Sequence, residues 1–199
     1  MKGWSIAVVF LCVALAGALL AGENPNAKIA VHVMTHNAKL SCSSSFPNLS
    51  DCDDIVYTVE SQDVDCFPVF FDLSEFLGCE YGMSWPGAYS AAFTSCSDLT
   101  IGGIVDPGDG VAHTWTECQN EDIAIPGWAW IYEPDSATVC IVQHPLSFGI
   151  RVLDCSEGLD GPKYDPYCAG IAGDDGDDPC GYPTVTKNST WGSVKSIFR

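Results

Sequence analysis

The sequence predicts an all-β protein: a disulfide-rich antiparallel β-sandwich that ends in a loop-rich, acidic C-terminal appendage. Short runs of aromatic and β-branched residues recur along the chain, with turn residues between them roughly every 8–12 positions, as in sandwiches and barrels. Eleven cysteines in 199 residues are typical of an exported, cross-linked domain. The clearest run covers residues 126–145, and we expect the sheets to be organised around it.

The N-terminal segment has the features of a secretory signal peptide. Lys2 supplies a positive charge, residues 6–20 are apolar, and the small residues Ala21 and Gly22 precede a polar stretch. The apolar run is shorter than the ~20 residues that a membrane-spanning helix needs. We therefore expect residues 1–22 to be a signal peptide, cleaved after Ala21 or after Gly22. The protein would then be secreted or held at the cell surface, with no membrane span; a retained signal anchor is the alternative.

Ten cysteines remain once Cys12 leaves with the signal peptide. An even number in an exported chain predicts five disulfides. Metal ligation is the alternative, but no Cys-x-x-Cys motif supports a zinc site. The connectivity stays open, and the neighbour pairs Cys42–Cys52 and Cys168–Cys180 are guesses. The candidates are Cys42, Cys52, Cys66, Cys79, Cys96, Cys118, Cys140, Cys155, Cys168 and Cys180.

The chain is strongly acidic, with a formal net charge of −18. Such a surface repels nucleic acid and anionic lipid, so we expect neither as a partner. Two acidic loops, residues 106–110 and 174–178, each contain glycine and are candidate calcium sites, because their carboxylates supply hard oxygen ligands. The second loop lacks EF-hand spacing, and solvated acidic loops are the alternative reading. The candidate ligands are Asp106, Asp109, Asp174, Asp175, Asp177 and Asp178.

The first predicted strand of the mature chain covers residues 27–34. A loop rich in Ser, Asn and Asp follows over residues 41–54, in which Ser50 or Asp51 is expected to cap a short helical turn. Two core strands are predicted at residues 67–71 and 79–85. They are rich in aromatic and β-branched residues, and a Pro-Gly turn signal ends the second.

The middle of the chain continues the same pattern. Phe93 lies in one short predicted strand, and residues 99–105 and 111–116 form two more, separated by the turn at 106–110. Residues 148–153 are the last clear strand. These strands place the sandwich domain at residues 23–155.

Residues 126–145 predict a β-hairpin. Trp128, Trp130 and Tyr132 alternate with other residues, and a second β-rich run over residues 138–142 follows a Pro-Asp-Ser turn. Three large rings on one strand face need a partner sheet to bury them, which predicts two layers. Trp128 and Trp130 are also the candidate binding residues, because exposed rings can stack on a sugar. The alternative is that most of the rings are core.

The end of the chain differs in composition. Residues 156–183 are predicted to be an acidic loop region, pinned by disulfides and without a core of its own. Residues 184–199 contain no acid and are predicted to be a linker and a sorting or docking tail. The tail residues expected to matter are Trp191, Lys195 and Phe198.

Catalytic motifs are missing from the sequence. It contains no H-E-x-x-H, P-loop, G-x-G-x-x-G or nucleophile elbow. The spacing of His113 and His144 does not support a Ser-His-Asp site, and paired carboxylates occur in any chain this acidic. We therefore predict a non-enzymatic protein without catalytic residues. Its partner would be an extracellular protein or a glycan, or it would assemble through its tail. A secreted hydrolase with a carboxylate-based site and a carbohydrate-binding module are the alternatives.

The order of β segments over residues 27–155 resembles that of cohesin-type and carbohydrate-binding β-sandwiches. This resemblance implies a jelly-roll or cohesin-like fold. Cohesins are not rich in cysteine, so their partner specificity is not transferred. The resemblance is carried by residues 67–72, 78–85, 99–105, 123–132 and 137–142.

The C-terminal tail supports a second resemblance. Thr190-Trp191-Gly192-Ser193-Val194-Lys195 is similar to the Thr-Trp-Gly-x-x-Lys tail of secreted, cysteine-rich proteins of environmental bacteria. Residues 68–73 and 125–128 look like segments of the same proteins. This resemblance implies export and a role of the tail in sorting or attachment, and it implies no particular activity.

Overall fold

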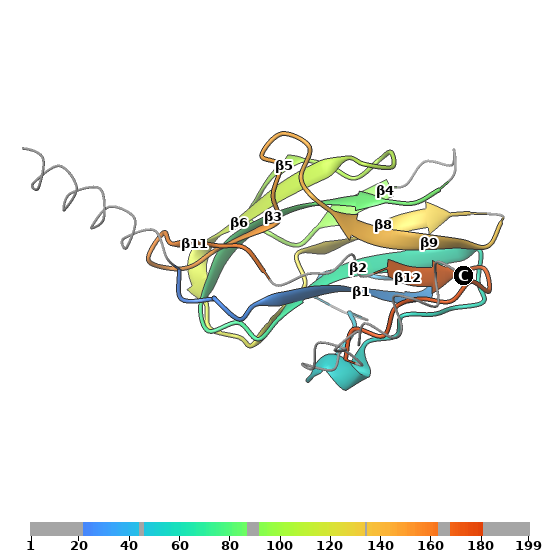
Figure 1. Cartoon of the computed structure of the whole chain (residues 1–199), viewed down its shortest axis with the longest axis horizontal. Helices are drawn as coiled ribbons and strands as arrows, with labels where there is room; N and C mark the ends of the chain where they lie inside the picture. Colours follow the sequence, from blue (N-terminus) through green and yellow to red (C-terminus); the bar gives the residue numbers. More distant parts are fainter. Residues whose placement is uncertain (1–21, 44–45, 87–91, 134, 163–167, 181–199) are drawn as a thin grey trace, which may run out of the picture.

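The computed structural model describes residues 22–43, 46–86, 92–133, 135–162 and 168–180. These residues form two antiparallel β-sheets that pack face to face (Figure 1). The predicted disulfide-rich β-sandwich is therefore confirmed. Residues 1–21 of the predicted signal peptide and the tail residues Trp191, Lys195 and Phe198 lie outside the described residues.

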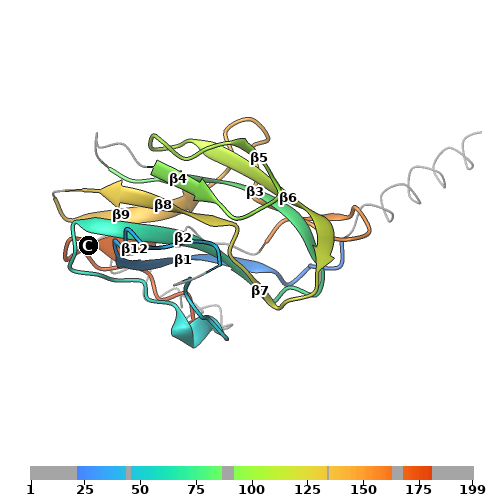
Figure 2. The same ribbon diagram turned by 180° about the vertical axis from the view of Figure 1, so that it is seen from behind.

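The first sheet has five strands, and β2 is its longest member. In Figure 2 the labels β1, β2, β8 and β4 follow one another from the bottom to the top of the view. The short β7 pairs with the end of β2. The strands are β1 (Lys28–Thr35), β2 (Asp63–Phe71), β4 (Ala92–Ser95), β7 (Ile123–Ala124) and β8 (Gly127–Tyr132).

The second sheet has seven strands and is built around β3. One edge of β3 pairs with β6, and the other pairs with β10 and, further along, with β9. The outer strands are β5 beside β6, β11 beside β10 and β12 beside β9. The strands are β3 (Phe76–Ser84), β5 (Leu99–Gly102), β6 (Gly110–Gln119), β9 (Ala137–Val142), β10 (Arg151–Leu153), β11 (Leu159–Asp160) and β12 (Cys168–Ile171).

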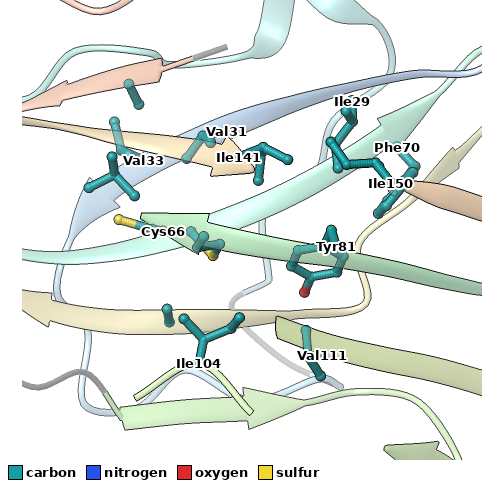
Figure 3. Close-up of a cluster of buried hydrophobic side chains, with 14 of the residues drawn as sticks. Ile29, Val31, Val33, Cys66, Phe70, Tyr81, Ile104, Val111, Ile141 and Ile150 are labelled. Carbon is teal, nitrogen blue, oxygen red and sulfur yellow. The ribbon is translucent and has the colours of Figure 1, made fainter. Parts of the chain in front are cut away.

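The core lies between the two sheets, where alternate side chains of each strand point inward. Figure 3 shows Ile29 and Phe70 of the five-stranded sheet close to Tyr81 and Ile141 of the seven-stranded sheet. All four side chains are fully buried. Burial of this apolar surface is the main driving force for pairing the sheets.

The predicted hairpin at residues 126–145 is wrong, although both of its strands exist. β8 lies between β2 and β4 in the five-stranded sheet, whereas β9 pairs with β3 and β12 in the seven-stranded sheet. The chain therefore crosses from one layer to the other between the end of β8 at Tyr132 and the start of β9 at Ala137. Alternation specifies that a strand has one buried face, but it does not specify which strand lies beside it.

The aromatic face of β8 was predicted to pack against the partner sheet, but it points away from that sheet. Ala129 and Ile131 are fully buried in the central core, so Trp128 and its alternate neighbours lie on the outer face. Trp128 is covered there by the segment of residues 46–57, and its ring centroid is 6.0 Å from that of Phe46. This outer cluster is a second, smaller core.

The segment of residues 46–57, which covers Trp128, contains the predicted helical turn. A 3-10 turn, η1 (Cys52–Asp54), begins after Asp51, whose carboxylate accepts a hydrogen bond of 2.9 Å from the Asp53 N–H. The sequence prediction of a cap at Ser50 or Asp51 is confirmed for Asp51, since its carboxylate satisfies a free N–H of the first turn.

Four disulfides join eight of the ten candidate cysteines: Cys42–Cys96, Cys52–Cys180, Cys118–Cys155 and Cys140–Cys168. Both guessed neighbour pairs are wrong. The loop that holds Cys42 and Cys52 folds back over the five-stranded sheet, so each of these residues meets a cysteine far along the chain.

The expected fifth disulfide is absent, because Cys66 and Cys79 are free thiols inside the core. Cys66 lies on β2 and Cys79 on β3, in the two facing sheets. Packed sheets lie about 10 Å apart, and a disulfide needs Cα atoms within about 7 Å. These two thiols therefore act as small apolar core residues.

Within the predicted loop region, residues 168–171 are joined to the sandwich rather than appended to it. β12 pairs with β9 over four residues, and Ala169 and Ile171 are fully buried in the central core. The sequence prediction of a loop region without core residues differs from the structure here, because a short strand flanked by acidic loops carries little periodicity. Across the described parts of the chain, no helix is long and apolar enough to cross a bilayer.

Candidate functional site

The outer face of the seven-stranded sheet carries a shallow apolar groove. Arg151, Glu80, Ala112 and Ile101 are successive cross-strand partners on β10, β3, β6 and β5. Side chains next to them along the strands, such as that of His113, point into the core. The row from Arg151 to Ile101 therefore faces outward.

Two loops form the walls of this groove. Ile101 is 67% exposed on β5, Val105 lies in the loop after β5, and Leu146 is 84% exposed in the loop after β9. These three side chains, together with Glu80 and Ala112, line a hollow of about 610 Å³. We call this hollow the apolar groove. A smaller hollow of about 160 Å³ continues it toward β10 and β11.

The loop that carries Leu146 is organised by His144. The His144 Nδ1 atom accepts hydrogen bonds from the backbone N–H groups of Leu146 at 3.2 Å and Ser147 at 3.4 Å. The Phe148 N–H donates to the His144 carbonyl at 2.9 Å. The loop, seen beside β5 in Figure 1, thus holds Leu146 and Phe148 outward, and Phe148 is 78% exposed.

A glycine on β6 allows this loop to lie against the sheet. A Cβ atom at Gly110 would collide with Pro145 and with the ring of His144. Any other residue at this position would push the loop away and open the groove. The close approach of the two backbones therefore depends on the sequence at residue 110.

The floor of the groove contains one ion pair. Arg151 Nε lies 3.2 Å from Glu80 Oε1, and Arg151 also donates to the Ser147 carbonyl at 3.2 Å. Small residues adjoin the pair: Ala112 is the cross-strand partner of Glu80 on β6, and Gly78 lies two residues before Glu80 on β3. A flat floor of this kind lets a ligand's backbone come close to the sheet.

The turn predicted to bind calcium forms one end of this groove. Asp109 Oδ2 accepts hydrogen bonds from the N–H groups of Val105 at 3.1 Å and Asp106 at 2.9 Å. Its carboxylate thus closes the turn. Asp106 is exposed.

The second predicted calcium loop uses several of its carboxylates in the same way. Asp174 Oδ1 accepts from the Asp175 N–H, Asp177 Oδ2 from the Cys168 N–H and Asp178 Oδ1 from the Cys180 N–H, at 2.9, 3.2 and 2.9 Å. These bonds hold the loop against β12.

Within the described residues, the candidate ligands of the two loops do not form a group of three whose oxygens lie within 4.8 Å of one another. A group of that size does form from Glu75, Cys118 and Cys155. Two of its members are joined in a disulfide, and disulfide sulfur is not the thiolate that binds metals.

The two candidate binding tryptophans differ in their surroundings. Trp128 is 6% exposed and belongs to the outer cluster under the loop, whereas Trp130 is 40% exposed. The Trp130 Nε1–H donates to Asp63 Oδ1 at 2.5 Å, and the His36 ring stacks on the indole at 4.8 Å. Tyr132, two residues along β8, is also exposed on this face.

A buried hydrogen-bond network surrounds His113. Its Nδ1 lies 3.2 Å from Ser95 Oγ and 3.0 Å from Ser97 Oγ, and its Nε2 lies 3.2 Å from the Tyr81 hydroxyl. Burial lowers the pKa of His113 to about 4. A serine beside a histidine suggests a nucleophile, but this imidazole is 4% exposed and its partners are hydroxyl groups. The network therefore organises the core.

The apolar groove was not predicted from the sequence. Leu146 and Phe148 lie in a tight turn between Pro145 and Gly149, where polar residues are usual. Large apolar residues in such a turn could have indicated an exposed apolar surface. Ile101 alternates like an ordinary strand residue, so its exposure depends on which sheet face remains uncovered.

The chain was compared with protein families, curated proteins and solved structures. No protein-family model matches the chain, and no curated protein matches its sequence. Among solved structures, the chain is similar to a type II cohesin domain from the cellulosome of Acetivibrio cellulolyticus. The two share 10% sequence identity with a TM-score of 0.46, and the match covers 74% of this chain and 96% of the cohesin domain.

Proposed function

We propose that this protein is a non-catalytic extracellular binding module that holds an apolar segment of a partner protein in the apolar groove. The observation that carries the proposal is the gathering of exposed Ile101, Val105 and Leu146 around one sheet face. Contiguous exposed apolar surface on a soluble protein is typical of an interaction site.

The energetics of the groove suit such a ligand. Burying one of these side chains is worth about 1.5–3 kcal/mol, so two or three contacts offset much of the cost of association. The low floor around Ala112 leaves room for the ligand's main chain, and the Glu80–Arg151 pair offers polar groups that orient it.

Extracellular function is supported by two features. The predicted signal peptide implies export, and four disulfides suit an oxidising compartment. A sorting or attachment role of residues 184–199 fits this location. Deletion of residues 190–199 should reduce retention at the cell surface, measured by fractionation of the producing cells.

The test of groove binding is a selection from a displayed peptide library. Peptides are selected on the wild-type protein and then counter-selected against the Ile101→Asp/Leu146→Asp variant. We expect enriched peptides rich in apolar residues, whose Kd rises at least about tenfold in the variant because each lost apolar contact is worth ~1.4 kcal/mol or more. Isothermal titration calorimetry measures the two Kd values.

A matched variant, Trp130→Ala, removes an exposed ring from the opposite face. It should leave peptide affinity unchanged. Ile101 and Leu146 are largely exposed, so the Tm of their variant should stay near that of the wild type. Trp130→Ala also removes the contacts of the indole with Asp63 and His36, so its affinity is measured well below its own Tm. Peptides that bind wild type and the Ile101→Asp/Leu146→Asp variant equally would contradict the proposal.

Glycan binding is the second candidate, favoured by the exposed rings of Trp130 and Tyr132 on one flat strand face. A glycan array probed with wild type and with Trp130→Ala separates the two functions. Glycan binding that is lost in Trp130→Ala and kept in the Ile101→Asp/Leu146→Asp variant would favour the carbohydrate-binding module.

The hydrolase alternative needs a carboxyl group with a raised pKa to act as the general acid. The pKa values of Asp54 and Asp98 are instead lowered. Hydrogen bonds from the backbone and hydroxyl of Ser50 lower the pKa of Asp54, and those of Thr116 lower the pKa of Asp98. Neither residue suits that role.

A further inference from the structure

The first described residues of the chain are held firmly in the fold. Asn24 is 1% exposed. Its side-chain amide donates to the Glu75 carbonyl at 2.5 Å, and its Oδ1 accepts from the Ser74 N–H at 2.8 Å. The buried Ala27 N–H donates to the Asn24 carbonyl at 3.0 Å. This segment is therefore part of the folded domain from its start.

Two aspartates accept hydrogen bonds from the backbone nitrogens of residues 22–24. Asp160 accepts from the Gly22 nitrogen at 3.2 Å and from the Asn24 nitrogen at 2.6 Å. Asp154, which is 1% exposed, accepts from the Glu23 nitrogen at 2.7 Å. We call Asp154 and Asp160 the amino-terminal cradle. Figure 1 shows the blue start of the chain beside the orange loop that carries β11.

The cradle is shaped around a glycine. A Cβ atom at Gly22 would collide with the Asp160 carboxylate and lie 3.1 Å from Asp154 Oδ2. A Cβ atom at Gly158 would lie 2.6 Å from the Cα atom of Gly22. Gly22 thus fills a space that fits no larger residue.

Among the described residues, the carboxylates of the cradle have no cationic side chain as partner. In the described part of the chain, no ion pair joins Asp154 or Asp160 to a Lys, Arg or His. Asp154 Oδ1 instead accepts from the N–H groups of Ser156 at 2.8 Å and Gly158 at 2.6 Å. A positive charge on the Gly22 nitrogen would lie 3.2 Å from Asp160 Oδ1, and within the described residues no Lys, Arg or His side chain competes for that carboxylate.

We propose that signal peptidase cleaves the bond between Ala21 and Gly22, and that the cradle binds the new α-ammonium group of Gly22 as an ion pair. Hydrolysis consumes one water and converts the amide into an Ala21 carboxylate and a Gly22 ammonium. The Gly22 nitrogen changes from a neutral single donor into a cation with three donors. Hydrogen bonds with charged partners are stronger than neutral ones, so cleavage stabilises the folded domain. Cleavage after Gly22 would empty the space beside Gly158 and remove the donor to Asp160 Oδ1.

The first test is the N-terminal residue of the exported protein. The full chain is expressed with export, and intact-mass spectrometry with N-terminal peptide sequencing identifies the first residue. Gly22 is the expected result. A chain that begins at Glu23 or later, or that keeps Ala21, overturns the proposal.

The second test measures the ion pair itself. A chain that begins at Gly22 is compared with the same chain acetylated at its α-amino group, each with Asp160 or with Asp160→Asn. Acetylation should lower the Tm by roughly 3–6 °C with Asp160 present, and by much less in Asp160→Asn. Glu121→Gln removes an exposed charge elsewhere, and acetylation should lower its Tm as much as in wild type.

An equal loss on acetylation in wild type and in Asp160→Asn overturns the ion pair. If Asp160→Asn does not fold, the pH dependence of the wild type replaces it. The carboxylates raise the pKa of the α-ammonium group above its unfolded value of about 8. Its stabilising effect is then fully present below pH ~8 and lost as the pH rises through the folded pKa. The difference in Tm between the free and the acetylated chain should vanish there, and a difference that persists contradicts the proposal.

Discussion

Burial of His113 is expected to make the stability of the folded protein depend on pH. Its pKa is lowered to about 4 because the ring is buried on the inner face of β6, whereas an unfolded histidine titrates near 6.5. Between these values the unfolded state binds a proton that the folded state does not. Stability should therefore fall as the pH decreases from about 6.5 to 4, by about 3 kcal/mol for this residue.

The variant His113→Gln keeps hydrogen-bonding groups but does not titrate in this range. Its Tm at pH 7 should be lower than that of the wild type, because the glutamine side chain cannot reproduce the contacts of the imidazole ring with the Tyr81 and Ser97 hydroxyl groups. From pH 7 to pH 4, the wild type should lose roughly 6–12 °C more than the variant. Thermal unfolding at several pH values measures this difference, and parallel profiles would contradict the assigned cause.

The free thiols give a second prediction at the scale of residues. Cys66 and Cys79 are buried, and burial raises the pKa of both thiols, so neither reacts while the protein is folded. Iodoacetamide should label no cysteine of the mature native protein and two after denaturation without reductant. Mass spectrometry counts the labels. Unlabelled denatured protein would show that a fifth disulfide exists.

At the scale of elements, the disulfides differ in the length of chain they close. Cys52–Cys180 spans 128 residues and Cys140–Cys168 spans 28. The loop-entropy relation gives about 5 kcal/mol for the first and about 3.5 kcal/mol for the second. Urea unfolding of Cys52→Ala/Cys180→Ala and Cys140→Ala/Cys168→Ala tests the order. The reverse order would show that packing of β12 on β9 outweighs the loop length.

Strand identity was predictable from the sequence, but strand pairing was not. The runs at residues 27–34, 67–71 and 79–85 lie in β1, β2 and β3, because alternation and β-branched residues are local signals. β8 and β9 also exist, yet they separate into different sheets. Their partners β2 and β3 are distant in sequence, and the choice between a hairpin and a layer crossing depends on those long-range contacts.

At the scale of the whole molecule, the net charge of −18 predicts a response to calcium. We expect the Tm of the mature protein to rise with calcium relative to chelator, by roughly 5–10 °C at a hundredfold excess over Kd. Asp175→Asn should remove the rise if the ion lies at residues 174–178, and Asp106→Asn if it lies at the other loop. Magnesium is the control, since it prefers stricter geometry. Unchanged Tm would contradict the calcium proposal.

At the scale of the whole molecule, composition and sequence pattern determine the fold class but not the arrangement of the strands. The count of cysteines, the acidic balance and the period-two runs were sufficient for an all-β, disulfide-rich sandwich, since these properties belong to residues and their near neighbours. The tertiary structure alone decided the disulfide pairs, the two free thiols, the outward face of Trp130 and the apolar groove. Each of these depends on which distant strands lie side by side, and only the balance of burial over the whole chain determines that arrangement.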